Sequence, residues 1–179
     1  MIMKKLKSLI YSLLASMIVL SCSSPQAKKK EAIKTLEDEL FADENKMIDR
    51  DKASELVKVY VSFADEFPND KDTPDYLFKA GDMSMNLSMP QNAIQVFDRI
   101  LKDYPDFEKA PQCLFLKGYV YENEIGDLNA AKKIYQDFIA KYPNDEFADD
   151  AAVSIKNLGK SPEELIKEFE TKSKEEGKI

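Results

Sequence analysis

The chain has 179 residues, a formal net charge of −7, 33% charged residues and no histidine. This length fits a single domain, and the acidic balance argues against a nucleic-acid partner. Without histidine, the chain has no histidine-based catalytic triad, no histidine metal site and no imidazole acid–base chemistry.

The start of the chain, residues 1–21, has the parts of a secretory signal peptide. Lys4, Lys5 and Lys7 form a positive start, and Ser8–Leu20 is a charge-free, largely apolar run. A helix needs about 20 apolar residues to span a bilayer, so this run is too short to be a membrane span. We therefore expect residues 1–21 to be removed on export.

The residues before Cys22 resemble the lipobox of bacterial lipoproteins, with a branched apolar Val19 and a small Ser21. The resemblance implies that Cys22 carries a diacylglyceryl group and becomes an acylated N-terminus, which two or three fatty chains anchor firmly. The alternative is an ordinary secretory signal whose cleavage site happens to precede a cysteine. Cleavage would move the net charge from −7 to −10, because it removes three Lys and no acid.

Residues 22–30 are predicted to form a flexible tether between the membrane and the folded domain. The segment SSPQAKKK is polar and has no apolar periodicity, and Lys28–Lys30 are interpreted as solvated. The acidic cluster that directs some lipoproteins to the cell surface is absent after Cys22. We therefore expect a lipid anchor in the outer membrane and a domain that faces the periplasm.

From residue 31 to residue 179 the sequence predicts an all-α domain. Helix-forming residues dominate, and apolar residues recur at spacings of three and four. Prolines mark the helix boundaries, because proline is tolerated only in the first turn of a helix or outside it. We predict about eight helices, near residues 31–45, 50–66, 74–87, 90–103, 109–124, 128–141, 145–158 and 162–175. The last one starts at a capping-box pattern, Ser161 to Glu164.

Three helix ends share one sequence corner. The corners are Phe67-Pro68-Asn69-Asp70, Tyr104-Pro105-Asp106 and Tyr142-Pro143-Asn144-Asp145, so the proline recurs at nearly equal intervals along the chain. Positions −12, −8 and −5 relative to each proline are apolar and lie on one helical face: Leu56, Tyr60, Phe63; Ala93, Phe97, Ile100; Ala131, Tyr135, Phe138. Self-similarity at this period indicates an array of helical repeats.

Two glycines occupy equivalent places, because Gly81 stands at position +13 from Pro68 and Gly118 at position +13 from Pro105. Glycine inside a helix costs about 1 kcal/mol relative to alanine, so the pair indicates close backbone packing. The spacing from Gly118 to Ala131 is longer by one position than the spacing from Gly81 to Ala93. The extra residue predicts an insertion near residues 124–127.

These features resemble the tetratricopeptide repeat, in which a small residue in one helix and an alanine in the next allow close packing. The resemblance covers roughly residues 50–158, with residues 31–50 and a C-terminal capping helix near 162–175 as atypical ends. It implies a right-handed superhelix of antiparallel helix pairs. The corners are most similar to those of periplasmic repeat lipoproteins related to BamD and to the C-terminal half of CpoB. The alternative is an unrelated helical bundle.

In such repeats the first helix of each pair lines a concave groove that binds protein segments. The family's groove positions fall on Asp75, Phe78, Asp82, Met85, Asn86, Gln112, Phe115, Tyr119, Glu122 and Asn123, and an incomplete third unit adds Asp150, Val153 and Asn157. Aromatic, methionine and amide side chains suit the capture of an extended or helical peptide. The sequence leaves open whether Phe78 and Phe115 line the groove or the core.

The resulting hypothesis is a membrane-anchored adaptor in outer-membrane protein assembly or envelope maintenance, and not an enzyme. Its expected partners are envelope proteins; no catalytic residue, metal, cofactor, nucleic acid or small-molecule substrate is expected. Glycines do not cluster into a phosphate-binding loop, and Cys113 has no histidine to activate it and is predicted to be a packing residue. The alternative is a hydrolase or solute-binding lipoprotein that works through carboxylates, which would need a deep pocket containing acids with raised pKa.

Overall fold

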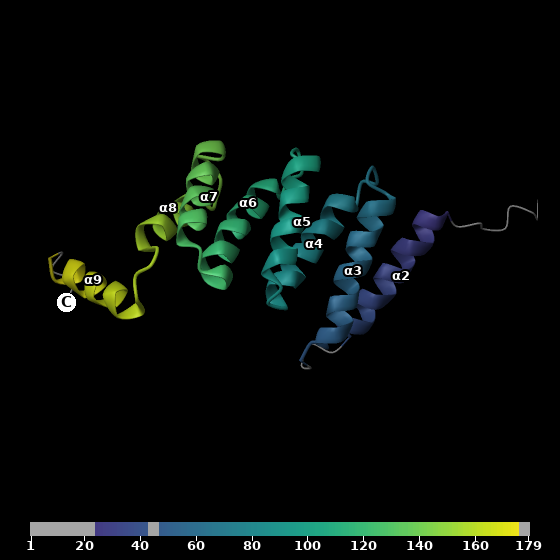
Figure 1. Ribbon diagram of the computed structural model, residues 1–179, viewed down its shortest axis with the longest axis horizontal. Helices are drawn as coiled ribbons and strands as arrows, with labels where there is room; N and C mark the ends of the chain where they lie inside the picture. Colours follow the sequence, from purple (N-terminus) through teal and green to yellow (C-terminus); the bar gives the residue numbers. More distant parts are fainter. Residues whose placement is uncertain (1–23, 43–46, 176–179) are drawn as a thin grey trace, which may run out of the picture.

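The computed structural model describes residues 24–42 and 47–175, and the regular elements within these ranges are all helices. In chain order they are α2 (Pro25–Leu40), α3 (Arg50–Glu66), α4 (Thr73–Asn86), α5 (Pro90–Asp103), α6 (Ala110–Val120), the π-helix η1 (Tyr121–Ile125), α7 (Leu128–Lys141), α8 (Ala148–Asn157) and α9 (Pro162–Glu175). Helices α2 to α8 stack side by side, each antiparallel to the one before it (Figure 1). The predicted all-α fold is confirmed.

The predicted signal peptide, residues 1–21, and the predicted lipidation site, Cys22, lie outside the described residues. Both therefore stay predictions. Among the helices of the described ranges, none combines the length and the apolar character that a bilayer-spanning helix needs.

Helix α2 begins earlier than predicted, and this corrects the tether. Ser24 is its N-cap, whose Oγ accepts a hydrogen bond from the Ala27 N–H at 3.1 Å, and Pro25 occupies the first helical position. Residues 25–30 are thus helical, and Ile33 on the same helix is fully buried. The prediction of a tether over these residues was wrong because it weighed polarity above the Ser-Pro helix start. The helix also ends at Leu40 instead of near residue 45.

The three aromatic-proline corners have the same backbone geometry. Phe67, Tyr104 and Tyr142 have φ of −130°, −133° and −130° and ψ of 58°, 55° and 59°. The N–H of each donates to the carbonyl four residues earlier, at 2.8, 2.9 and 2.8 Å. The Tyr104 hydroxyl also donates to the Pro68 carbonyl at 2.8 Å, so that neighbouring corners meet on one edge of the stack.

The repeat positions form the core. All nine apolar positions found by counting back from the prolines are at most 1% exposed. A Cβ at Gly118 would lie 2.6 Å from Cε1 of Tyr135, and a Cβ at Gly81 would overlap the ring of Phe97. Each glycine therefore admits the large side chain of the paired helix, and the prediction of close packing is confirmed.

The extra residue of the second clear repeat is accommodated by η1. Helix α6 continues directly into this π-helical turn, and the chain leaves it at Gly126 with φ of 78°. A π-turn takes up one additional residue while the flanking turns keep their register. The helix predicted over 109–124 thus ends as an α-helix at Val120, and η1 begins before the predicted insertion region, 124–127, and overlaps its first two residues.

The C-terminal helix α9 forms but does not cap the stack. Its start is the predicted capping box, in which Ser161 N–H donates to Glu164 Oε2 at 2.8 Å and Glu164 N–H donates to Ser161 Oγ at 3.2 Å. Ile166 and Phe169 nevertheless remain 59% and 68% exposed. The helix stands away from the stack (Figure 1), because the chain turns outward at Gly159, where φ is 76°. The capping role predicted for this helix is therefore wrong.

Candidate functional site

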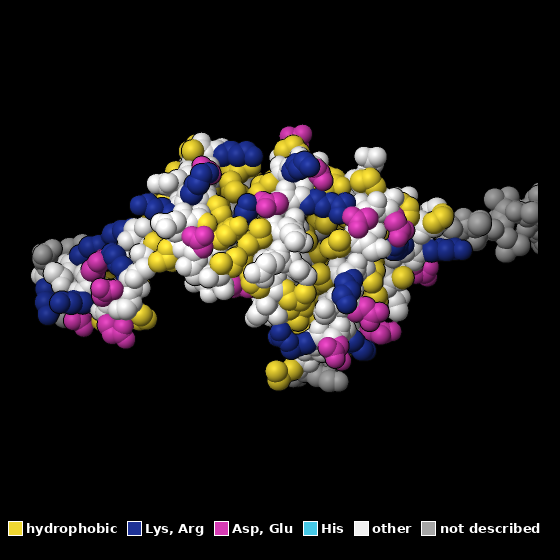
Figure 2. Space-filling view, in the orientation of Figure 1, with side chains coloured by type: hydrophobic (Ala, Val, Ile, Leu, Met, Phe, Trp, Pro, Cys, Tyr) yellow, Lys and Arg dark blue, Asp and Glu magenta, His cyan; other side chains and the backbone are white. Residues whose placement is uncertain are grey.

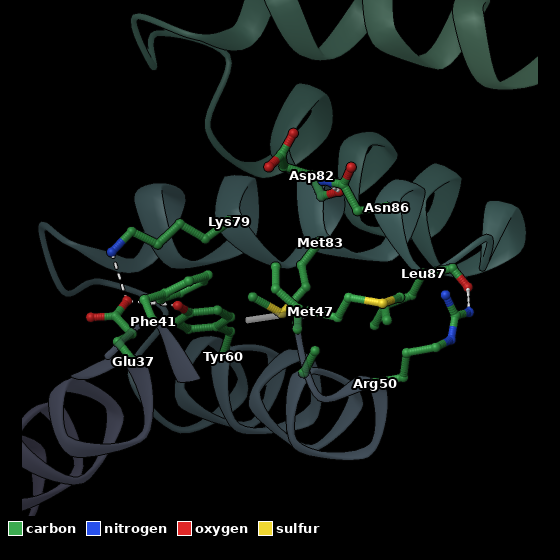
Figure 3. A pocket seen from close by; sticks show the side chains of 12 residues that line it. Glu37, Phe41, Met47, Arg50, Tyr60, Lys79, Asp82, Met83, Asn86 and Leu87 are labelled. Carbon is green, nitrogen blue, oxygen red and sulfur yellow. Dashed lines mark hydrogen bonds and ion pairs between the residues drawn. The ribbon is translucent and has the colours of Figure 1, made fainter. Parts of the chain in front are cut away.

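A cavity of about 780 Å³ opens between α2, α3 and α4 (Figure 3). Its apolar lining comes from both sides of the α2–α3 link and from α4: Phe41, Met47, Ile48, Ala53, Tyr60, Met83 and Leu87. Phe41, Met47 and Ile48 are 50%, 92% and 50% exposed. A concave, mostly apolar cavity bordered by a few polar groups is typical of a binding site.

Polar contacts fix the walls of this cavity. Glu37 of α2 accepts hydrogen bonds from the Tyr60 hydroxyl at 2.6 Å and from Lys79 Nζ at 2.7 Å, which links three helices. Burial and the hydrogen bond to Glu37 raise the pKa of Tyr60, so it remains a neutral donor. Arg50 donates to the Leu87 carbonyl at 2.6 Å, and so satisfies an acceptor that the end of α4 leaves free.

Two of the predicted groove residues, Asp82 and Asn86, border the cavity on the α4 side (Figure 3). Both are exposed, and within residues 24–42 and 47–175 no ion pair involves Asp82. Met83 lies between them in sequence and faces Met47 across the opening. Methionine side chains are flexible and polarizable, so this pair can adapt to different apolar groups.

The two phenylalanines that the sequence left open pack against other side chains. Phe115 stacks on Phe147 with ring centroids 5.0 Å apart, and it packs against the core formed by α7 and α8. Phe78 meets Phe107 edge-on at 6.4 Å, and Lys109 Nζ lies 5.0 Å from its ring centroid. Both rings are half-buried, so packing accounts for most of their surface.

Three further groove candidates are engaged within the protein. Asp75 pairs with Lys109 at 3.1 Å, and Met85 is half-buried against the core. Glu122 accepts a hydrogen bond from the Tyr135 hydroxyl at 2.8 Å, and burial together with this bond raises the tyrosine's pKa. Tyr135 and Tyr60 occupy the same repeat position, and each is thus paired with a glutamate.

The other predicted groove residues lie farther along the stack. On α6, Tyr119 is 44% exposed and Gln112 is half-buried; Asn123 on η1, one turn after Tyr119, donates to the Tyr119 carbonyl at 3.1 Å. On α8, Asp150 is exposed, Val153 is 55% exposed and Asn157 is half-buried. These residues do not border the cavity between α2 and α4, and their role in binding stays a prediction.

Sequence reasoning missed the apolar part of the cavity. Phe41, Met47 and Ile48 fall in a stretch that was interpreted only as an atypical cap, and Met83 is not a family groove position. A signal was present, because three large apolar residues within the polar link between two helices are unusual. Figure 2 shows other hydrophobic side chains on one face of the stack, interrupted by charged ones.

Two titratable groups lie away from this cavity. Cys113 is fully buried, and burial raises the pKa of its thiol to about 12, which confirms its predicted packing role. Burial raises the pKa of Glu124 on η1, and its Oε2 has no hydrogen-bond partner among the described residues. In the same ranges, no group of three or more acidic, cysteine or histidine side chains could hold a metal ion.

Comparison with known proteins agrees with this architecture. Residues 75–106 and 112–145 match the tetratricopeptide repeat family, and they cover α4–α5 and α6–α7 with their corners. The chain therefore contains tetratricopeptide repeats within a superhelical stack of that type, which indicates a protein–protein interaction module. A search of the curated proteins found no match to the chain.

Proposed function

We propose that the protein is a lipid-anchored envelope adaptor that holds a segment of another protein in the cavity between α2, α3 and α4. The supporting observation is the cavity itself, whose walls are fixed by Glu37 and Arg50 while Met47 stays 92% exposed beside it. A site with fixed walls loses little conformational entropy when it binds a partner. Exposed apolar side chains at its mouth provide the anchor for a partner's apolar residue.

The charges around the cavity indicate the chemistry of the partner. Lys79 pairs with Glu37, and Arg50 donates to a carbonyl, so both cations are engaged within the protein. Asp82 is left to face an incoming segment, and the whole chain carries a net charge of −7. A segment with a large apolar side chain next to a lysine or arginine fits this arrangement.

The envelope location rests on the sequence around Cys22 and on the resemblance to periplasmic repeat lipoproteins related to BamD and CpoB. These support an anchor in the outer membrane, a domain facing the periplasm, and a role in outer-membrane protein assembly or envelope maintenance. Cys22→Ala is expected to move the protein from the membrane fraction to the soluble fraction. An unchanged distribution would contradict the lipid anchor.

A photo-crosslinking amino acid placed at Met47 tests the cavity in intact cells. We expect a protein adduct from Met47, and no adduct from a matched probe at Lys133 on α7, whose side chain is 77% exposed. Ile48→Asp, at another exposed position of the lining, should abolish the Met47 adduct without altering the helical melting curve. Equal adducts from both probes, or an adduct that survives Ile48→Asp, would contradict the proposal.

The same assay measures how far the site extends along the stack. Tyr119→Ala combined with Asn123→Ala removes two exposed side chains of the predicted groove, one on α6 and one on η1. We expect a several-fold lower yield of the Met47 adduct. An unchanged yield would confine the binding site to the α2–α4 cavity.

A carboxylate-based hydrolase or solute-binding lipoprotein is the second candidate. Such a site needs facing acids with raised pKa inside a pocket. Among the described residues Glu124 is the acid whose pKa is raised, and it lies on η1 instead of in the cavity. This placement favours the adaptor.

A further inference from the structure

We propose that one edge of the stack lies directly against the bilayer that holds the lipidated cysteine. This anchor edge consists of the start of α2, residues 24–30, and the corner at residues 67–72. The inference rests on the lipid anchor of the proposed function. Its starting point is the position of the first helix, because Ser23 alone separates Cys22 from the N-cap Ser24.

The short connection limits how far the folded part can move from the membrane. Consecutive Cα atoms are about 3.8 Å apart, so the Cα atoms of Cys22 and Ser24 are separated by at most about 7 Å. A flexible tether over residues 22–30 would instead give a typical reach of roughly 15–18 Å. The first turn of α2 therefore begins at the level of the lipid headgroups.

Side-chain contacts join this first turn to the corner after α3. Lys30 Nζ lies 2.7 Å from Asp70 and 2.7 Å from Asp72, Gln26 donates to Asp70, and Lys29 pairs with Glu66. Burial alone would raise the pKa of Asp70, but these hydrogen bonds and the Asp72 N–H outweigh it and lower the pKa. The carboxylate stays ionised and paired, so the start of α2 and the corner after α3 stay side by side and can approach the bilayer together.

The charges along α2 are arranged against its own helix dipole. Lysines lie near its start, at Lys28, Lys29 and Lys30, and acids lie in its last turns, at Glu37, Asp38 and Glu39. The dipole favours the opposite order. Contacts with the corner and with Glu66 explain Lys29 and Lys30, but Lys28 remains exposed. Anionic headgroups next to the start of the helix attract these lysines and so stabilise this arrangement of charges.

The anchor edge differs in charge from the other corners. Its acids Asp70 and Asp72 are paired, as is the neighbouring Glu66 at the end of α3. Its exposed cations are Lys28 and Lys71, the latter 3.9 Å from Asp72, and Glu31 is the exposed acid of the neighbouring turn. The second corner carries Asp106 and Glu108 beside Lys109, which pairs with Asp75, and the third carries Asp145 and Glu146. Anionic lipid therefore repels the later corners, and the stack leans away from the bilayer with the first corner in contact.

This orientation sets the direction in which the cavity opens. Phe41, Arg50 and Leu87 lie at the ends of α2, α3 and α4 that are opposite the anchor edge. Helix α2 has 16 residues and is about 24 Å long, so the end of the cavity at Phe41 faces the aqueous compartment up to about that far from the headgroups. A partner segment is then bound without touching the lipid.

Fluorescence energy transfer to a headgroup-labelled lipid tests the orientation in the full, lipidated chain. The protein is reconstituted in vesicles of phosphatidylethanolamine and phosphatidylglycerol, with a donor dye on Asn69→Cys or on the matched control Asp51→Cys. Both positions are exposed and lie at opposite ends of α3, and Cys113 is fully buried and so does not take the label. We expect efficient transfer from Asn69 and several-fold weaker transfer from Asp51.

A ten-residue Gly-Ser insertion between Ser23 and Ser24 lengthens the connection and leaves the N-cap intact. We expect it to lower transfer from Asn69 towards the Asp51 value. Membrane-bound protein with equal transfer from both positions would overturn this inference while leaving the anchor intact. Protein recovered in the supernatant as completely as Cys22→Ala would overturn the anchor and the inference together.

Discussion

The two ends of the stack each carry one amphipathic helix, and only the N-terminal one docks. Helix α2 has 16 residues, inserts a fully buried Ile33, and pairs Lys30 with Asp70, whose side chain is 3% exposed. Helix α9 has 14 residues and a well-formed capping box, yet Ile166 is 59% exposed and Phe169 is 68% exposed. Both sequences specify a helix, but one alone joins the core.

The difference between these ends lies in what each helix meets. The start of α2 lies beside the corner after α3, where Lys30 of α2 pairs with Asp70. In addition, the Tyr60 hydroxyl of α3 donates a hydrogen bond to the Glu37 carboxylate of α2. The link before α9 turns outward at Gly159, and its Lys160 pairs with Glu168 of α9 itself at 2.7 Å. Helical periodicity predicts that a helix forms, whereas contacts between distant residues decide whether it docks.

The largest expected effect comes from the same side-chain truncation, isoleucine to alanine, made in each of the two terminal helices. Ile33→Ala should lower the free energy of unfolding by about 2–5 kcal/mol, because it leaves a cavity under α2. Ile166→Ala, at an exposed position, should change it by no more than about 0.5 kcal/mol. Urea unfolding followed by circular dichroism measures both. Equal losses would show that α9 docks in solution as firmly as α2.

The interior of the stack was predictable because equivalent positions of each repeat are subject to the same packing constraints. The prolines recur at a nearly fixed period, and the residues counted back from them fill the core. The composition of the chain alone does not single out Gly81 and Gly118. Their equal distance from a corner proline predicts close helix packing, which the structure confirms. Periodic positions are predictable because the same local physics applies at each copy.

The ends and the site were predictable only in part, because they have no second copy to compare. The start of α2 depends on Lys29 and Lys30 meeting acids that lie far later in the chain, at Glu66, Asp70 and Asp72. The cavity depends on the α2–α3 link, which carries Met47, lying beside α4, which carries Met83. Asp82 and Asn86 were found through the family's groove positions, whereas the exposed apolar residues of the lining, Phe41, Met47 and Ile48, belong to the irregular α2–α3 link.

The second prediction removes the ion pairs that dock α2. Lys30→Met should cost about 1–3 kcal/mol, because Asp70 is left as a nearly buried carboxylate without its cation. Lys160→Met, the matched change beside α9, should have no measurable effect on unfolding, because Glu168 stays solvated. A loss at Lys160 as large as the loss at Lys30 would remove the distinction between the ends.

The Lys30→Met effect should also depend on pH. The folded state lowers the pKa of Asp70, so the stabilisation it gives is present above the unfolded value of about 3.9 and disappears as the pH falls through the folded pKa. Wild type and Lys30→Met should therefore converge in acid. A difference that persists unchanged at pH 3 would show that the lysine acts through packing alone.

The smallest expected effect concerns Glu124, whose pKa is shifted in the direction opposite to that of Asp70. Burial raises its pKa, and no described residue donates to its Oε2, so ionisation opposes folding. The pH dependence of stability from Glu124 therefore has the opposite sign to that from Asp70. Its contribution to stability is greatest below the unfolded pKa of about 4.3 and declines as the pH rises. Glu124→Gln removes the charge, so it should raise the free energy of unfolding at pH 7.5 by less than about 1 kcal/mol, since the side chain is only partly buried.

Unfolding of Glu124→Gln and wild type at pH 7.5 and pH 4 distinguishes a charge effect from a packing effect. If the unpaired charge causes the difference, the gain should shrink at pH 4, whereas the Lys30→Met loss shrinks only when Asp70 is protonated. A variant that is less stable than wild type at pH 7.5 would mean that the Glu124 carboxylate has a favourable partner.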